Sequence, residues 1–115
     1  MSKSEIYKRE LSKLNEIFED VEESKRKLVE GLIEDAAFLR SENHVLKQII
    51  TQTGMVKVHP EHPELQKPTE SAKQYSKSVK DYCVVIKTLS GVLMRNTAED
   101  DEEYNKILEE MRKNA

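Results

Sequence analysis

The sequence contains no tryptophan, one cysteine, three glycines and three prolines, and aromatic residues make up 5% of its 115 residues. So few glycines and prolines leave too few turns for a β-sandwich or a barrel. The lone Cys83 has no partner for a disulfide within the chain, which fits a reducing compartment. Because it lies in the apolar run of residues 82–86, we expect a buried small hydrophobic side chain and not a nucleophile.

Long apolar runs are also missing. The N-terminus lacks the apolar stretch of a signal peptide, and no window reaches the ~18 apolar residues of a membrane span. We therefore expect a soluble, intracellular protein with no membrane partner.

Charged residues, by contrast, are abundant and make up 36% of the chain, against about 25% in ordinary globular domains. Such a composition is typical of long helices with a narrow apolar stripe, many of which close their core only against another subunit. The net charge of -3 gives no global argument for binding nucleic acid, so any such argument rests on local patches.

The N-terminal half of the sequence has a helical pattern. Residues 4–53 contain no proline and one glycine, and their apolar residues recur at alternating spacings of three and four. An extra step of four between residues 31 and 36 indicates either two helices or one long helix that changes face. We favour a hairpin of two helices over residues 1–54. Its break is expected near residues 19–24, where Asp20 and Glu23 resemble a capping box and Ser24 offers a second N-cap.

A seam of leucine and valine residues along this hairpin is the expected interface of a homo-oligomer larger than a dimer. Four thin helices of one small chain cannot bury all of these side chains. Asn43 also lies on the seam, where it either fixes the register of the assembly or marks a helix edge turned to water. The expected interface residues are Leu14, Val21, Leu28, Leu32, Leu39 and Leu46.

The helical pattern stops at Gly54, and all three prolines follow within the next segment. Residues 55–68 are therefore expected to form an extended connector, a stiff strap across the helical surface. Residues 69–115 are expected to form two further helices. Thr69 caps the first, which runs to about Leu93, and Thr97 and Asp100 open the second. The sequence thus predicts an all-α fold.

Few residues suggest catalysis or metal binding. His59 and His62 lie three apart, but the prolines between and around them exclude a helix, and no third histidine or cysteine is near. Carboxylates such as Glu16 and Glu19 have the spacing of a magnesium site, yet lysines and arginines interleave them as on a solvated helix face. We expect no metal, no cofactor and no enzymatic activity.

Two clusters of basic residues are more informative. The first is Lys25, Arg26 and Lys27 near the expected turn of the hairpin. The second is a stripe on one face of the third helix, since about 100° per residue places its members within a quarter of the circumference. On an isolated monomer such residues are usually solvated surface, whereas an oligomer repeats each patch in every subunit. The stripe consists of Lys73, Lys77, Lys80 and Lys87.

The order of these features resembles the short, all-helical small subunits of tailed-phage terminases. The resemblance covers roughly residues 5–95: the run 28–39 leads into a helix closed by Gly54, a proline-rich strap follows, and then comes a helix with Tyr75, Leu89 and Leu93 on or beside its core face. It implies an oligomer, such as a ring, that recognises viral double-stranded DNA in the cytoplasm of the infected host cell. It also implies regulation of the terminase large subunit, which holds the ATPase and nuclease. The alternative is a helical adaptor or coiled-coil interaction protein that does not bind DNA.

Overall fold

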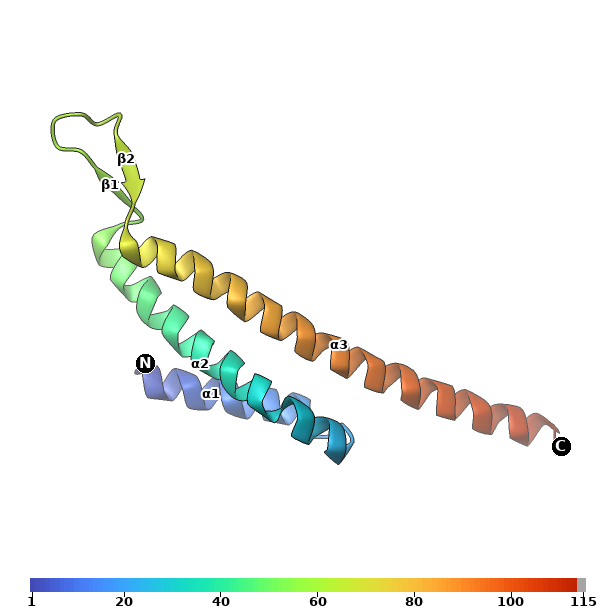
Figure 1. Cartoon of the computed structure of the whole chain (residues 1–115). Helices are drawn as coiled ribbons and strands as arrows, with labels where there is room; N and C mark the ends of the chain where they lie inside the picture. The colour runs from blue at the N-terminus through green and yellow to red at the C-terminus, as the bar shows by residue number, and fades with distance from the viewer. Residues whose placement is uncertain (114–115) are drawn as a thin grey trace.

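The computed structural model describes residues 1–113, together with their side chains except those of residues 96–101, 103 and 104. Its helices are α1 (Lys3–Ile17), α2 (Glu23–Thr53) and α3 (Glu70–Lys113), and two short strands, β1 (Val56–Val58) and β2 (Gln66–Pro68), lie between α2 and α3 (Figure 1). Helix accounts for 78% of the chain, well above the one third of an average domain, which confirms the predicted all-α class.

Helices α1 and α2 form the predicted hairpin. The Ser2 hydroxyl caps α1 by accepting the backbone N–H of Glu5 at 3.1 Å. Helix α1 ends at Ile17 and α2 begins at Glu23, so the turn overlaps the expected stretch. The expected caps of α2 are wrong, however. Its N-cap is Glu22, whose side chain makes no capping hydrogen bond. Ser24 cannot be the N-cap because α2 starts before it, and its hydroxyl donates to the Glu22 carboxylate at 2.9 Å.

The connector between α2 and α3 differs from the expected strap. Gly54 ends α2 with a φ of 78°, a conformation that suits glycine. The chain then folds back on itself as an antiparallel ribbon, with Val56 opposite Pro68 and Lys57 opposite Lys67. The ribbon is exposed throughout and projects from one end of the helices instead of crossing them (Figure 1). Two prolines lie in its loop and the third at the end of β2, positions that tolerate a missing N–H.

The two expected C-terminal helices are one continuous helix. The hydroxyl of Thr69 caps α3 as predicted, since it accepts the backbone N–H of Ala72 at 3.3 Å. The helix then continues to Lys113 without a break at Thr97 or Asp100. Residues 92–113 contain neither glycine nor proline, so nothing in this stretch stops a helix once it has started.

The core lies where α1, the first half of α2 and the middle of α3 meet. Two side chains of the expected subunit interface, Leu14 and Val21, are buried here within their own chain. Cys83 is exposed, contrary to expectation, because Tyr82, Val85 and Ile86 are the side chains that α3 turns toward this core. The buried core residues are Leu14, Phe18, Val21, Val29, Ile33, Ala36 and Leu89.

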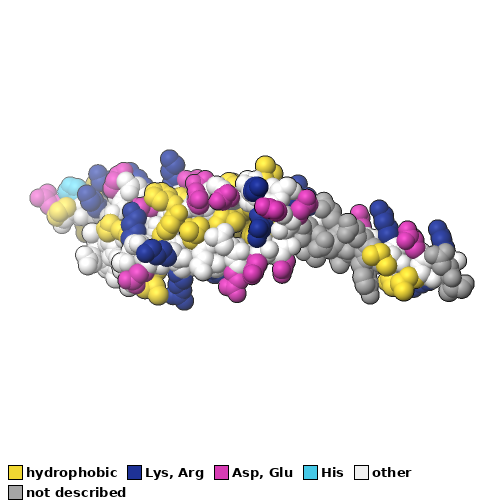
Figure 2. Space-filling model, turned by 90° about the horizontal axis from the view of Figure 1, so that it is seen from below, with side chains coloured by type: hydrophobic (Ala, Val, Ile, Leu, Met, Phe, Trp, Pro, Cys, Tyr) yellow, Lys and Arg dark blue, Asp and Glu magenta, His cyan; other side chains and the backbone are white. Residues whose placement is uncertain are grey.

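The molecule is elongated. Its radius of gyration is 21.7 Å and its extents are 84 × 30 × 19 Å, whereas a compact chain of 100 residues has a radius of about 13 Å. Several large apolar side chains consequently face solvent, led by Leu28 at 83% exposure, and Figure 2 shows hydrophobic side chains gathered on the surface. Within the described part of the chain, no helix combines the length and apolar character that crossing a membrane requires.

Four polar side chains are buried in the described residues, namely Glu10, Ser41, Asn43 and Thr69, and two of them bear on how the helices pack. Asn43 is only 4% exposed, so α2 does not turn a wet edge at this position, and its Oδ1 has no hydrogen-bond partner among the described residues. Glu10, 6% exposed, accepts the hydroxyl of Tyr82 at 2.9 Å and lies 3.4 Å from the Nζ of Lys13. Burial and this hydrogen bond to Glu10 raise the pKa of Tyr82 to about 12. The Glu10–Tyr82 pair links α1 directly to α3.

Candidate nucleic-acid interface

The basic residues Lys25, Arg26 and Lys27, which we term the hairpin-end cluster, lie at the start of α2, beside the loop that joins α2 to α1. Its three residues do not point the same way. Arg26 donates from Nη1 to the backbone carbonyl of Glu19 at 3.3 Å, which ties the start of α2 to the preceding loop. The ammonium of Lys27 lies 3.7 Å from the carboxylate of Glu23, one turn earlier on the same helix.

Arg26 and Lys27 share a hollow of about 310 Å³ between α1 and α2. Two carboxylates, Glu23 and Glu30, line the same hollow, so the acidic and basic side chains balance. Because these carboxylates repel a phosphate, this side of the hairpin end is a poor surface for DNA. The lining residues are Asn15, Phe18, Glu23, Arg26, Lys27, Glu30 and Ile33.

Lys25 lies on the other side of the hairpin end, facing α3. Among the described residues, it lines a shallow groove of about 230 Å³ with Leu28, Val92 and Arg95. Arg95 is held by a hydrogen bond from its Nε to the carbonyl of Gly91 at 3.2 Å. Of the three predicted residues, only Lys25 lies in this groove, and the structure places beside it Arg95, which sequence reasoning missed.

The lysine stripe runs along the exposed side of α3. Lys73, Lys77, Lys80 and Lys87 are all exposed, and only Lys73 among them has an ion pair in the described residues, at 4.0 Å from Glu70. At 100° per residue, Arg95 falls in the same quarter of the helix as the stripe. The stripe thus continues to the groove at the hairpin end, and the line from Lys73 to Arg95 is about 33 Å long. Continuing the same helical spacing past Lys87 in the sequence would have found Arg95.

The predicted interface residues of the hairpin separate into three groups. Leu14 and Val21 are in the core, and Leu32, Leu39 and Leu46 are half-buried. Leu28 is almost fully exposed and lines the groove of Lys25 and Arg95. Among the six predicted interface residues, Leu28 therefore has the largest exposed apolar area that another subunit could cover.

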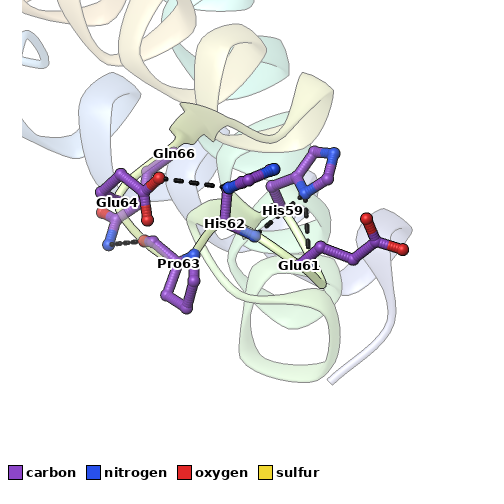
Figure 3. Close-up of polar contacts among 6 residues, drawn as sticks. All are labelled: His59, Glu61, His62, Pro63, Glu64 and Gln66. Carbon is purple, nitrogen blue, oxygen red and sulfur yellow. Dashed lines mark hydrogen bonds and ion pairs between the residues drawn. The ribbon is translucent and has the colours of Figure 1, made fainter.

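The histidine-rich loop forms the tip of the ribbon (Figure 3). The Nδ1 of His59 accepts the backbone N–H groups of Glu61 and His62, both at 3.2 Å, and the two imidazole rings lie 5.2 Å apart. The Nδ1 of His62 lies 3.4 Å from the carboxylate of Glu64. Both Nδ1 atoms thus have partners within the loop, and in the described residues no group of three metal-ligating side chains converges. The histidines shape the ribbon tip.

Comparisons with protein-family models, with curated proteins and with solved structures find no match to this chain.

Proposed function

We propose that this chain is a non-catalytic small subunit of a tailed-phage terminase. In this proposal it forms an oligomer, such as a ring, that recognises viral double-stranded DNA in the cytoplasm of the infected cell. It initiates genome packaging and regulates the ATPase and nuclease of the large subunit. The observation that carries the proposal is the line of basic side chains from the stripe on α3 through Arg95 to Lys25.

This line has the dimensions and charge that suit a DNA backbone. One negative charge occurs per ≈ 1.7 Å along duplex DNA, so a basic line of about 33 Å faces many phosphates at once. Multiplicity provides the rest, because each chain has a net charge of -3 and should bind weakly alone. Several copies that engage one duplex raise the apparent affinity without any new kind of contact.

The elongated shape supports the oligomer. The chain is 84 Å long and leaves Leu28 83% exposed. It therefore has apolar surface outside its own core that another subunit could cover. An assembly that covers Leu28 would also bring the neighbouring Lys25 and Arg95 of each subunit into one repeated surface.

The test is duplex binding measured over a range of salt concentrations. Lys25→Ser with Arg95→Ser should flatten the dependence of log affinity on log salt by about 1.8 for each engaged chain, since each lost phosphate contact removes about 0.9. The matched control, Lys8→Ser with Lys57→Ser, removes the same charge from exposed sites elsewhere and should leave the slope unchanged. An unchanged slope in the first variant would refute this surface.

A helical adaptor that does not bind DNA is the second candidate. The ion pairs of Lys27 with Glu23 and of Lys73 with Glu70 favour it, because such pairs lower the positive charge that a phosphate would meet. The same experiment separates the two functions. If the unmodified protein binds no duplex even at ~50 mM salt, where electrostatic binding is strong, the adaptor replaces the terminase subunit.

A further inference from the structure

A second basic hollow lies between α1 and α2, away from the hairpin end. It has a volume of about 300 Å³, and its described lining residues are Ile6, Arg9, Glu10, Lys13 and Arg40. The first four lie on one side of α1, at the three- and four-residue spacing of a helix face, and Arg40 belongs to α2. Three cations and one carboxylate give these residues a formal charge of +2, whereas the charges that line the hollow at the hairpin end cancel.

The carboxylate of this hollow already has its partners. Glu10 is 6% exposed, its Oε1 accepts the hydroxyl of Tyr82 at 2.9 Å, and its Oε2 lies 3.4 Å from the Nζ of Lys13. Both oxygens are therefore engaged, and the single positive charge of Lys13 balances the single negative charge of Glu10. The charges of Arg9 and Arg40 are left over.

The two arginines also retain most of their hydrogen-bond donors. Arg9 donates from Nη1 to the Sδ of Met1 at 3.6 Å, and a thioether is a weak acceptor. The guanidinium of Arg40 lies 5.6 Å from the centre of the Tyr82 ring, a stacking contact that orients it, and among the described residues it has no hydrogen bond or ion pair. Each guanidinium carries five N–H donors and stays charged, so the hollow offers an unsatisfied set of donors to an anion.

We propose that this hollow binds the phosphate group of a small phosphate monoester. Arg9 and Arg40 hold the phosphate from two helices, with Lys13 beside them, so the ligand bridges α1 and α2. A phosphate monoester carries a charge close to -2 near neutral pH, which matches the excess charge, and its oxygens accept the paired N–H groups of a guanidinium. Ile6 provides an apolar wall for the organic part of the ester.

The hollow and the lysine stripe lie on different sides of the molecule. Tyr82, which contacts both Glu10 and Arg40, lies about 160° around α3 from Lys80 of the stripe. A duplex bound along the stripe therefore leaves the hollow open. The phosphate site is thus separate from the proposed DNA surface and does not depend on the proposed function.

Isothermal titration calorimetry of the full-length protein with inorganic phosphate, at constant ionic strength, tests the site. One phosphate should bind per chain, and Arg9→Gln with Arg40→Gln should weaken binding at least about tenfold, since a hydrogen bond to a charged group contributes about that factor. The matched control is Lys8→Gln with Lys47→Gln. It removes the same charge from exposed positions of the same two helices, and Lys47 also lies over a ring, 6.0 Å from the centre of Tyr75, yet its affinity for phosphate should be unchanged.

Phenyl phosphate distinguishes an ester from free phosphate. It should bind about threefold more tightly than inorganic phosphate, because its ring also covers apolar surface of Ile6, and Ile6→Ser should remove this gain. Equal affinity for the two ligands overturns the assignment to an ester.

The remaining outcomes separate the site from the DNA surface. Absence of saturable phosphate binding to the unmodified protein, or an equal loss in the control variant, overturns the site. Arg9→Gln alone, which removes only the contact with Met1, should also lower the affinity and keeps the test valid if the double variant unfolds. The salt dependence of duplex binding should be the same with and without Arg9→Gln and Arg40→Gln. A flatter dependence without phosphate binding would assign the hollow to the DNA backbone, whereas phosphate binding without any duplex binding would overturn the proposed function alone.

Discussion

Leu28 and Leu14 belong to the same predicted seam, but their positions in the structure predict different effects when each is substituted. Leu14 is 5% exposed and packs in the core of its own chain, whereas Leu28 is 83% exposed. Leu14→Ala should lower the free energy of unfolding by about 2–5 kcal/mol at any protein concentration, because it leaves a cavity within one chain. Leu28→Ser should leave the fold of the chain intact and weaken only its association.

The size of the association effect follows from exposure. Full burial of a leucine is worth about 1.5–3 kcal/mol, so covering Leu28 contributes about 2 kcal/mol from each copy. Losing one copy of this contribution raises a dissociation constant about 30-fold, and losing two across a symmetric contact raises it about 1,000-fold. Sedimentation equilibrium over a concentration series measures this change, and urea unfolding of the same samples measures stability.

Val84→Ser provides the control for Leu28→Ser. Val84 is 64% exposed and lies on the lysine side of α3, which the proposed function leaves open to DNA, so its substitution should not change the mass. If Leu28→Ser sediments like the unmodified protein, Leu28 is not at an interface. If instead it lowers stability as Leu14→Ala does, the assignment of Leu28 to the outside of the core is wrong.

Three further measurements test local features. Cys83 is exposed, so a thiol reagent should modify one thiol per folded chain, and a reaction that requires denaturant would contradict the exposure. The pKa of Tyr82 is raised to about 12 from 10, so its neutral form contributes stability that is complete below pH 10 and is lost as the pH rises toward 12. Ultraviolet titration should show one late tyrosine step that Tyr82→Phe removes. Gly54→Ala should cost about 1 kcal/mol because of its positive φ, whereas Gly31→Ala, with open space around it inside α2, should gain about as much in thermal unfolding.

The parts of the fold that could be predicted from the sequence are those fixed by local chemistry. Gly54 ends a helix because its backbone adopts a φ that other residues rarely take, and Thr69 starts one because its hydroxyl reaches an N–H three residues on. The turn of the hairpin lies beside Asp20 and Glu23, the residues that indicated it, although neither of them is the N-cap of α2. Each of these signals lies within a few residues of the feature it specifies.

Features that depend on distant segments could not be predicted in the same way. The apolar period shows that Leu14 and Val21 face an apolar partner, but it does not show that this partner is the core of their own chain, to which α2 and α3 also contribute. The pairing of β1 with β2 joins Val56 to Pro68 across a loop, and prolines alone indicate only extended backbone. Arg95 meets Lys25 only because α3 returns along α2. Thr97 and Asp100 suggested a helix start because such residues favour caps, yet a helix already under way continues through them.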